Sequence, residues 1–367
     1  KVQDVADRFD NLRIPVAANL RVHGTTPYYG ANGIQDYVEG FTHDGEFVLV
    51  AEDGANDLKN YPVKCVNGRI WVNNHAHILQ GKAGIADNSF LAFAISQSDI
   101  ESLLVGGGRA KLNAETLMSI EFRLPCLQEQ YRIGEYLTQL DHLITLHQRK
   151  YDKLTNVKKS MLEKMFPKNG SNVPEIRFKG FTEAWEQRKF YELYEKVSRK
   201  NDLTYGKNDI ISVANMYFKS DSYITDESYL LTYNIFELGD IAFEGNKSKN
   251  YAHGRFVENT IGNGIVSHVF DVFRPIMKPY DLLFWKYAIN NEKLMGNILL
   301  RSTKASTMMT NLVANDFLQE EFSVPTYAEQ KKIGSFFQQL DNLITLHQRE
   351  LEKLKNLKKA CLEKMFV

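Results

Sequence analysis

The chain has 367 residues, of which 43% are hydrophobic and 25% charged, a composition typical of a globular protein with more than one domain. Its 45 basic and 45 acidic side chains cancel, which excludes a histone-like polycation and an acidic disordered tail. The three cysteines form no CxxC pair and no run of 18 apolar residues occurs, so we expect a protein of the reducing cytoplasm without a disulfide framework, a cysteine zinc site or a membrane span.

Residues 1–124 are predicted to form a mixed α/β domain. Segments 46–52 and 69–79 are rich in β-branched and aromatic residues, which indicates strands, and Gly and Asn between such segments indicate turns.

A long helix is predicted over 125–166. Residues that can form the contact seam between two helices, most of them apolar, recur every seven positions. This heptad spacing is typical of a coiled coil. The main seam positions are Ile133, Leu140, His147, Leu154 and Met161, joined by Tyr136 and Leu143. Pro167 ends the helix, and a Pro-, Gly- and Asn-containing connector follows over 167–188.

The rest of the chain repeats this order. A second α/β domain is predicted over 189–324, with strand-like residues in 261–275 and a helix over 281–295. A second long helix over 325–367 follows. Residues 321–366 match residues 121–166 at a constant offset of 200 without a gap, with 27 of 46 positions identical, so chance is excluded.

A weaker echo links the segment that begins at Lys1 to the segment that begins at Lys189, both with the pattern Lys-apolar-x-acid-apolar-x-acid-base-apolar. The chain therefore reads as two copies of one unit. If the two helices bury their apolar stripes against each other, connectivity requires them to run antiparallel. The predicted fold class is thus two tandem α/β (mixed α+β) domains separated by two long antiparallel coiled-coil helices, a pseudo-twofold dumb-bell.

Catalytic motifs are absent from the sequence. It contains no GxxxxGK[ST] phosphate loop, no GxGxxG, no GxSxG, no HExxH and no [DN]PP[YF]. His75 and His77 would share one face of a strand and so could form a metal pair, but no third ligand is visible, which favours polar strand positions and no metal site. We expect a chain that is not an enzyme by itself.

The constant blocks LDxLITLHQRxxxKLxxxKKxxLEKMF at 140–166 and 340–366, together with PEIRFKGFTEAWEQRKF at 174–190, resemble the conserved regions of type I restriction-modification specificity subunits. In that family two target-recognition domains alternate with two conserved helices. The resemblance implies a subunit that reads an asymmetric bipartite site in double-stranded DNA and docks two modification subunits and, through them, restriction subunits. It implies no cofactor on this chain, S-adenosylmethionine for adenine N6-methylation on the modification subunits, and ATP and Mg on the restriction subunits. One departure is that 174–188 has no counterpart before residue 1.

Under this reading, loops rich in Asn, Tyr, Gly and basic residues are the candidate DNA contacts. Asn can pair with adenine and Arg with guanine, and glycines allow the backbone to approach phosphate closely. In the first domain the candidates are Tyr28, Tyr29, Asn32, Asn73, Asn74, His75, Arg109 and Lys111. In the second domain they are Asn215, Tyr217, Lys219, Asn246, Lys247, Lys249, His268, Arg301, Lys304 and Ser306.

Partner subunits need an apolar surface, and aromatic residues are enriched at interfaces. The candidate anchors, expected to be exposed, are Tyr151, Phe166, Phe178, Phe181 and Trp185. Two alternatives stay open: a non-enzymatic coiled-coil scaffold whose domains bind protein or sugar, and a self-contained nuclease or methyltransferase, which the missing motifs disfavour.

Overall fold

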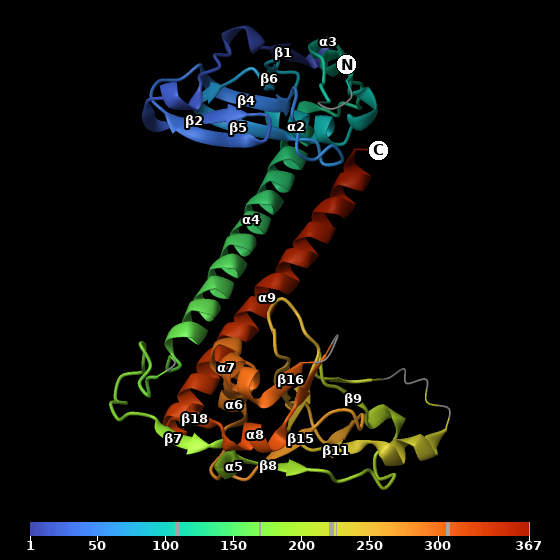
Figure 1. Cartoon of the computed structure of the whole chain (residues 1–367). Helices are drawn as coiled ribbons and strands as arrows, with labels where there is room; N and C mark the ends of the chain where they lie inside the picture. The colour runs from blue at the N-terminus through green and yellow to red at the C-terminus, as the bar shows by residue number, and fades with distance from the viewer. Residues whose placement is uncertain (107–109, 169, 220–223, 225, 306–308, 367) are drawn as a thin grey trace. The chain divides into compact units, whose positions relative to one another are not determined.

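The computed structural model describes the whole chain except residues 107–109, 169, 220–223, 225, 306–308 and 367. The chain folds into two compact units (Figure 1). Unit 1 consists of residues 1–149 and 348–367, and unit 2 of residues 150–347. Each unit therefore contains one globular domain and a part of both long helices.

Unit 1 is built on a six-stranded sheet with the order β1-β6-β4-β5-β2-β3. Neighbouring strands are antiparallel except for β2 and β5, which are parallel. The strands are β1 (Ala6–Arg8), β2 (His23–Gly30), β3 (Gly33–Val38), β4 (His43–Ala51), β5 (Val63–Val72) and β6 (Ala76–Gly81). The helices are α1 (Val2–Val5), α2 (Asn88–Ser96), α3 (Ala114–Ser119) and the first part of α4 (Leu127–Lys164).

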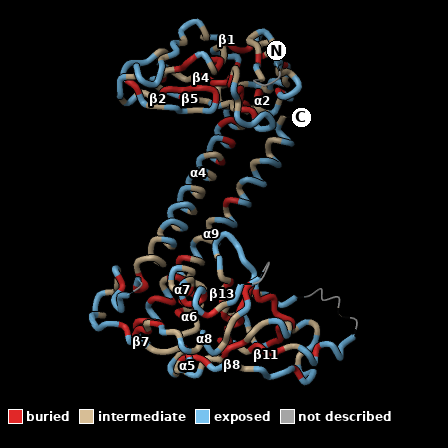
Figure 2. The backbone as a smooth tube through the Cα atoms, in the orientation of Figure 1, coloured by how far each residue is buried: buried red, intermediate tan, exposed pale blue. Residues whose placement is uncertain are grey.

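Strand β4 passes through the core of unit 1 and is buried on both faces. Val48 and Val50 join one apolar cluster together with Leu91 of α2, whereas Phe47 and Leu49 join another. This alternation is the two-residue period of a strand covered on both sides. Figure 2 shows the buried positions of this unit following its sheet. The predicted strand 69–79 is two strands, because a turn at 73–75 separates β5 from β6.

Unit 2 contains short strands arranged in several sheets. The largest has the order β13-β12-β15-β8, and β7 pairs separately with β18. The strands are β7 (Glu186–Lys189), β8 (Tyr194–Val197), β9 (Ile211–Ser212), β10 (Tyr217–Phe218), β11 (Asn234–Phe236), β12 (Ile241–Glu244), β13 (Arg255–Glu258), β14 (Gly264–Val266), β15 (Val272–Pro275), β16 (Thr303–Ala305), β17 (Thr310–Leu312) and β18 (Glu321–Val324). The helices are α5 (Phe190–Leu193), α6 (Leu282–Ile289), α7 (Glu292–Ser302), α8 (Ala314–Gln319) and most of α9 (Tyr327–Met365).

The predicted single helix 281–295 is wrong in its extent, because α6 ends at Ile289 and α7 begins at Glu292. Asn291 interrupts it by capping α7, and its side chain accepts a hydrogen bond from the backbone N–H of Lys293. An aromatic core lies beneath these helices, and Phe284 and Trp285 of α6 are completely buried in it.

The long helices run antiparallel within each unit. In unit 1, Phe366 stacks on Phe90 near the start of α4, while Lys358 reaches Asp141 farther along α4. The buried positions of α4 include Leu137 and Leu140, but Tyr136 and Leu143, which were predicted to belong to the seam, are exposed. The buried apolar stripe of α4 is therefore narrower than the heptad pattern predicts. None of the described helices is long and apolar enough to cross a membrane.

Both units attach their domain to a long helix in the same way. Gly134 of α4 lies against Asp87 and Phe90 at the start of α2, and Gly334 of α9 lies against Asp281 and Phe284 at the start of α6. In each case the aspartate caps the short helix by accepting a hydrogen bond of 2.8 Å from the backbone N–H three residues later.

The weak echo at the start of each domain is also structural. Helix α1 followed by β1 corresponds to α5 followed by β8. The backbone N–H of Val2 donates to the carbonyl of Ile120, and that of Phe190 donates to the carbonyl of Glu320, both at 3.0 Å. The two acceptors are 200 positions apart, so the repeat extends from the helices into the domains.

Candidate nucleic-acid interface

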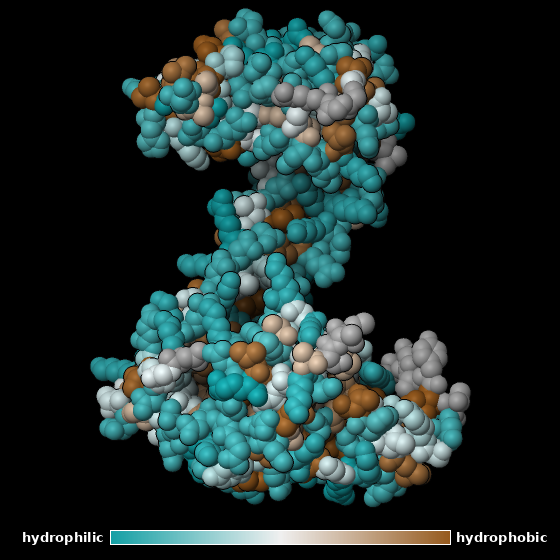
Figure 3. All heavy atoms as spheres, in the orientation of Figure 1, coloured by the Kyte–Doolittle hydropathy of each residue, from teal (hydrophilic) through white to brown (hydrophobic). Residues whose placement is uncertain are grey.

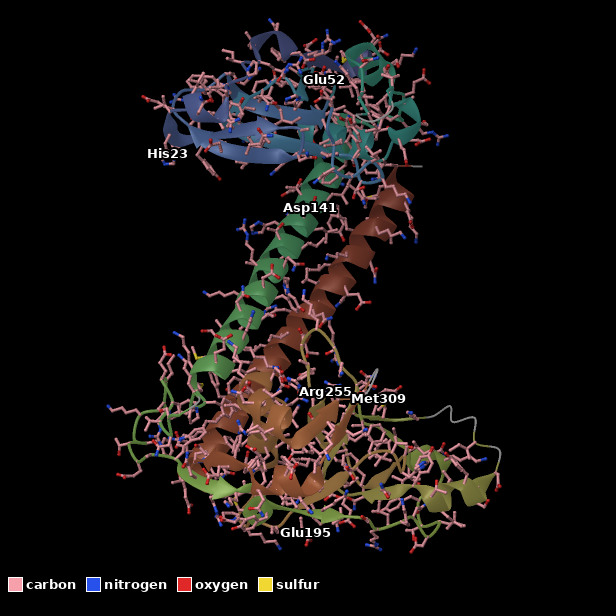
Figure 4. All side chains as sticks on the ribbon, in the orientation of Figure 1. His23, Glu52, Asp141, Glu195, Arg255 and Met309 are labelled. Carbon is pink, nitrogen blue, oxygen red and sulfur yellow. The ribbon has the colours of Figure 1, made fainter. Side chains whose placement is uncertain are left out.

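Three predicted loops of unit 1 meet at the segment 52–54, which directly follows β4. Lys111 forms an ion pair of 2.8 Å with Glu52, a residue labelled in Figure 4. His75 lies 2.5 Å from the carboxylate of Asp53, and Asn32 donates a hydrogen bond of 2.9 Å to the carbonyl of Gly54. Segment 52–54 therefore contacts the β2–β3 turn, the β5–β6 turn and Lys111, and brings the three together.

The charged side chains around segment 52–54 form close ion pairs. Burial alone would raise the pKa of Glu52, but hydrogen bonds from Lys111 and Arg13 and the nearby His77 hold its pKa below the ordinary value. Glu52 therefore stays ionised and neutralises part of the positive charge of Lys111. Segment 52–54 and the loops beside it therefore carry paired charges and exposed amide side chains rather than a strong positive field.

Burial separates the predicted residues of unit 1 into two groups. Asn32, Asn74 and Lys111 are exposed, and His75 is half-buried. The expectation that Tyr28, Tyr29 and Asn73 offer their side chains to DNA is wrong, because these three are buried. The phenol of Tyr28 accepts a hydrogen bond from Val16, and the amide of Asn73 supports the turn by accepting from the backbone N–H of His75 at 2.8 Å. Arg109 lies outside the described residues.

In unit 2 the β12–β13 connection links two other predicted loops. Asn246 forms a β-bridge with Met309, and Thr310 donates to the carbonyl of Gly245, so this connection lies against the β16–β17 hairpin. Arg255, at the start of β13, donates to Glu244 at 2.7 Å and to the carbonyl of Ala214 at 2.8 Å, which ties the β9–β10 turn to the same place. Arg255 and Met309 are labelled in Figure 4.

The exposed side chains of this cluster include seven of the predicted residues: Asn215, Tyr217, Lys219, Asn246, Lys247, Lys249 and Lys304. In the β9–β10 turn Met216 has a φ of 50°, a left-handed conformation that is uncommon outside glycine. Such strained turns are concentrated at functional sites.

Two predicted residues of unit 2 lie elsewhere. His268 is exposed, and its ring contacts Tyr229. Arg301 sits on α7, where its Nε donates to Glu320 at 2.8 Å, so its guanidinium is engaged in an ion pair. Ser306 lies outside the described residues.

Sequence reasoning missed the residues that hold the loops together: Glu52, Asp53 and Gly54 in unit 1, and Glu244 and Arg255 in unit 2. The signal that could have found them is their position, since Glu52 and Arg255 each stand at the end or start of a buried strand next to a predicted loop.

No metal site is formed by the described residues, in which no group of three or more His, Cys, Asp or Glu side chains is placed to hold an ion. The two histidines considered above turn to different partners. His75 faces Asp53, whereas both ring nitrogens of His77 are occupied, by Asp10 at 2.7 Å and by the carbonyl of Leu112 at 2.9 Å.

The expectation of exposure is wrong for two predicted partner anchors. Phe166 and Trp185 are buried and pack edge to face at 6.0 Å in the core of unit 2. Tyr151, Phe178 and Phe181 are half-buried, and Phe178 packs against Phe336 of α9. Figure 3 shows a largely hydrophilic surface with scattered hydrophobic patches.

Comparison with known families agrees with the repeat. The family model described as "Type I restriction modification DNA specificity domain" matches residues 1–156 and again residues 175–356. The chain belongs to this family. The two matches together cover nearly all of the chain, and each covers one domain with most of its long helix.

Individual members of the family are similar to this chain over different lengths. A protein of Haemophilus influenzae, named as a type I restriction enzyme specificity subunit, is 44% identical over 142 residues, which are 39% of this chain and 37% of that protein. The type I restriction enzyme MjaVIII specificity subunit of Methanocaldococcus jannaschii is 25% identical over 77% of this chain and 70% of its own length. The chain thus matches only about a third of the length of the first relative.

A solved member of the type I specificity family has the same fold. The crystal structure of the type I restriction-modification system S subunit from M. genitalium superposes with a TM-score of 0.66 over 100% of this chain and 95% of that one, at 14% sequence identity. At this identity the likeness supports the fold and not the choice of contact residues.

Proposed function

We propose that this chain is the DNA-recognition subunit of a type I restriction-modification complex and that its two domains read the two halves of a bipartite site. The observation that carries the proposal is that the two units attach their domains to the long helices in the same way but expose different loops. The two units share the same attachment of domain to helix, at Gly134 and Gly334, but present different loop clusters. Two different readers on one repeated frame suit an asymmetric site.

The recognition chemistry follows from the exposed groups. Asn74 in unit 1 offers an amide that can pair with the N6 and N7 positions of adenine in the major groove, whereas the amide of Asn32 is used within the loop, where it donates to Gly54 and accepts from the backbone N–H of Asn56. Lys249 and Lys304 in unit 2 are exposed and offer ammonium groups for phosphate, and such contacts position a protein on DNA without reading its sequence.

The catalytic steps belong to partners in this proposal. This chain would carry no cofactor, the two modification subunits would bind S-adenosylmethionine and methylate adenine N6, and restriction subunits would use ATP and Mg. The partner surface would include an exposed leucine pair that occurs in both copies, Leu143 with Leu146 on α4 and Leu343 with Leu346 on α9. An identical exposed pair on each helix suits two identical modification subunits.

The test is single-molecule sequencing of N6-methyladenine in source cells with and without the gene. Loss of one split motif, with two short and different halves, is expected on deletion. Variants of unit 1 and of unit 2 are then compared. If a variant of unit 1 alters one half of the motif and a variant of unit 2 alters the other half, each domain is assigned to its half-site. If all motifs persisted while the chain still copurified with a modification subunit, the DNA-reading role would be rejected and the scaffold reading adopted.

A further inference from the structure

The β9–β10 hairpin of unit 2 is held on both sides of its turn. Ile211 is buried in an apolar cluster of this unit. The backbone N–H of Met216 donates a hydrogen bond of 2.7 Å to the carbonyl of Ser212. From β13, the guanidinium of Arg255 donates one of 2.8 Å to the carbonyl of Ala214. Side chains near the turn are therefore presented on a backbone that is fixed to the domain.

Tyr217 is the large side chain that this hairpin leaves uncovered. It is 51% exposed, and its neighbour on β9 is Ser212, which is too small to cover an aromatic ring. Within the described part of the chain, the ring and hydroxyl of Tyr217 have no hydrogen bond, ion pair or ring contact. Phe218 points to the opposite face of the strand and lies beside Gly262, where a Cβ would be 3.6 Å from its ring. One aromatic residue thus supports the hairpin, and the other is offered to a ligand.

The loops around Tyr217 are basic. The described parts of the β9–β10 turn with β10, the β12–β13 connection and the β16–β17 hairpin contain four lysines and no acidic residue (213–219, 245–254, 303–305 and 309–312). Lys219, Lys249 and Lys304 are among the exposed side chains. Such a surface attracts a polyanion. An exposed aromatic ring among lysines is typical of sites that stack a base and bind the neighbouring phosphates.

The predicted tyrosines of unit 1 differ from Tyr217 in this respect. Tyr28 and Tyr29 are buried, and the charged side chains around segment 52–54 are paired. The two units therefore offer different chemistry at their predicted loops. Unit 1 offers an amide among paired charges, and unit 2 offers an aromatic ring among lysines.

We infer that Tyr217 inserts its ring at one base step of the half-site bound by unit 2, stacks on a base there and unstacks that step. This inference rests on the proposed function and adds a second way of reading DNA to it. Lys219, Lys249 and Lys304 bind the phosphates around the step, and the fixed hairpin holds the ring against the stack. Because pyrimidine–purine steps unstack most easily, unit 2 favours a half-site with a TA or CA step at this position.

The experiment uses the full chain assembled with its modification subunits and duplexes that carry the recognised site. The fluorescent base 2-aminopurine, which brightens when it is unstacked, replaces in turn each base of the unit 2 half-site. The adenine that is methylated is left out, because a methyltransferase extrudes its target base by itself. We expect the parent complex to brighten the probe at one step of this half-site.

Two variants of Tyr217 test the role of the ring. Tyr217→Ala is expected to lose the brightening and to weaken binding of the site about tenfold, because base–aromatic stacking is lost. Tyr217→Phe is expected to keep both, because it keeps the ring. The thermal midpoint of Tyr217→Ala is expected to equal that of the parent, since the exposed ring contributes little packing. Tyr191→Ala is the matched control, because Tyr191 is 46% exposed on α5, outside the three loops, and this variant is expected to behave as the parent.

Several results would overturn the inference while leaving the proposed function intact. They are specific binding by the parent complex without brightening at any probe, brightening that persists in Tyr217→Ala, and an equal loss in Tyr191→Ala. Tyr217→Ala that loses its modification subunits but keeps the brightening would assign the ring to a protein contact instead. Failure of the proposed function looks different, because the parent complex would then bind the site no better than a scrambled duplex.

Discussion

Lys158 and Asp341 form an ion pair of 2.5 Å in unit 2, and Lys358 and Asp141, each 200 positions from its counterpart, form the same pair in unit 1. Each lysine also lies over an aromatic ring at 5.4 Å, Tyr287 in unit 2 and Phe93 in unit 1. The repeat in the sequence is thus a repeat of individual contacts between a long helix, its antiparallel neighbour and a domain.

The two pairs differ by one hydroxyl, which gives the first prediction. Tyr287 donates a second hydrogen bond, of 2.8 Å, to Asp341, and Phe93 cannot donate one to Asp141. Asp341→Asn should therefore cost about 1 kcal/mol more in unfolding free energy than Asp141→Asn, because it weakens a charged hydrogen bond as well as a half-exposed ion pair. Urea unfolding of both variants checks this. The difference should vanish in the Tyr287→Phe background, and a difference that persists there would contradict the explanation.

The close approach of the two helix glycines gives the second prediction. A Cβ at Gly134 would lie 2.7 Å from Asp87 Oδ1 and 2.9 Å from Phe90 N, and a Cβ at Gly334 would lie 2.7 Å from Asp281 Oδ1. Alanine is normally better than glycine in a helix by about 1 kcal/mol. We expect the opposite sign here, a loss of about 1–3 kcal/mol for each variant, because fixed groups must move.

The control for the glycine variants is Gly296→Ala in α7. There a Cβ would meet only the flexible side chain of Glu292, at 3.1 Å, so thermal unfolding should show no loss or a small gain. A stabilised Gly134→Ala or Gly334→Ala would show that the domain does not bear on the helix at these points.

The third prediction concerns pH. Burial raises the pKa of Glu258 well above its ordinary value, although a hydrogen bond from Tyr280 opposes this. A carboxyl whose pKa is raised by folding stabilises the fold fully below its unfolded pKa, about 4.3, and this contribution is lost as pH rises through the folded pKa. Glu258→Gln stays neutral at every pH. Its advantage over the parent should therefore be larger at pH 8 than at pH 5, by more than about 1 kcal/mol, the value of a one-unit shift.

Unfolding midpoints at these two pH values decide the point. A parent that loses no stability between pH 5 and pH 8 relative to Glu258→Gln would mean that the carboxyl is ionised in the fold.

The exposed amide of Asn74 in unit 1 gives the fourth prediction. Asn74→Ala should relax one half of the DNA motif by about 1–3 kcal/mol of discrimination and leave the other half unchanged. Binding of the assembled complex to DNAs with single-base changes in each half measures this. Tyr28→Phe is the control: its buried hydroxyl contacts Val16, so it should lower stability without altering base preference. Equal effects on both halves would contradict a division of reading between the units.

The sequence predicted the architecture well because its strongest signals are periodic. The 200-residue offset predicted two equivalent units, and the heptads predicted two long helices. Burial at each helix position was harder to predict, because Tyr136 and Leu143 fit the heptad yet lie outside the narrow contact. The attachment through Gly134 depends on the tertiary structure and has no local signal beyond a glycine within a helix.

Loop chemistry was predicted as groups more reliably than as single residues. The predicted loops of each domain do meet, but the groups that join them, Glu52 to Gly54 and Arg255, look like ordinary strand ends in the sequence. Asn73 shows the limit most clearly: its residue type suits base reading, but its side chain is used to form the turn before His75. A composition-based argument cannot distinguish an asparagine that builds a loop from one that the loop presents.

Unit 1 takes its last contacts from residues 348–367, among them Lys358 and Phe366. A ribosome makes these residues almost 200 positions after the last residue of the first stretch of unit 1. The amino-terminal domain therefore lacks its contacts with residues 348–367 until all of unit 2 has been synthesised. A premature stop codon close to the end of the message would consequently damage the domain that was made first, and leave the domain nearest to the stop almost intact.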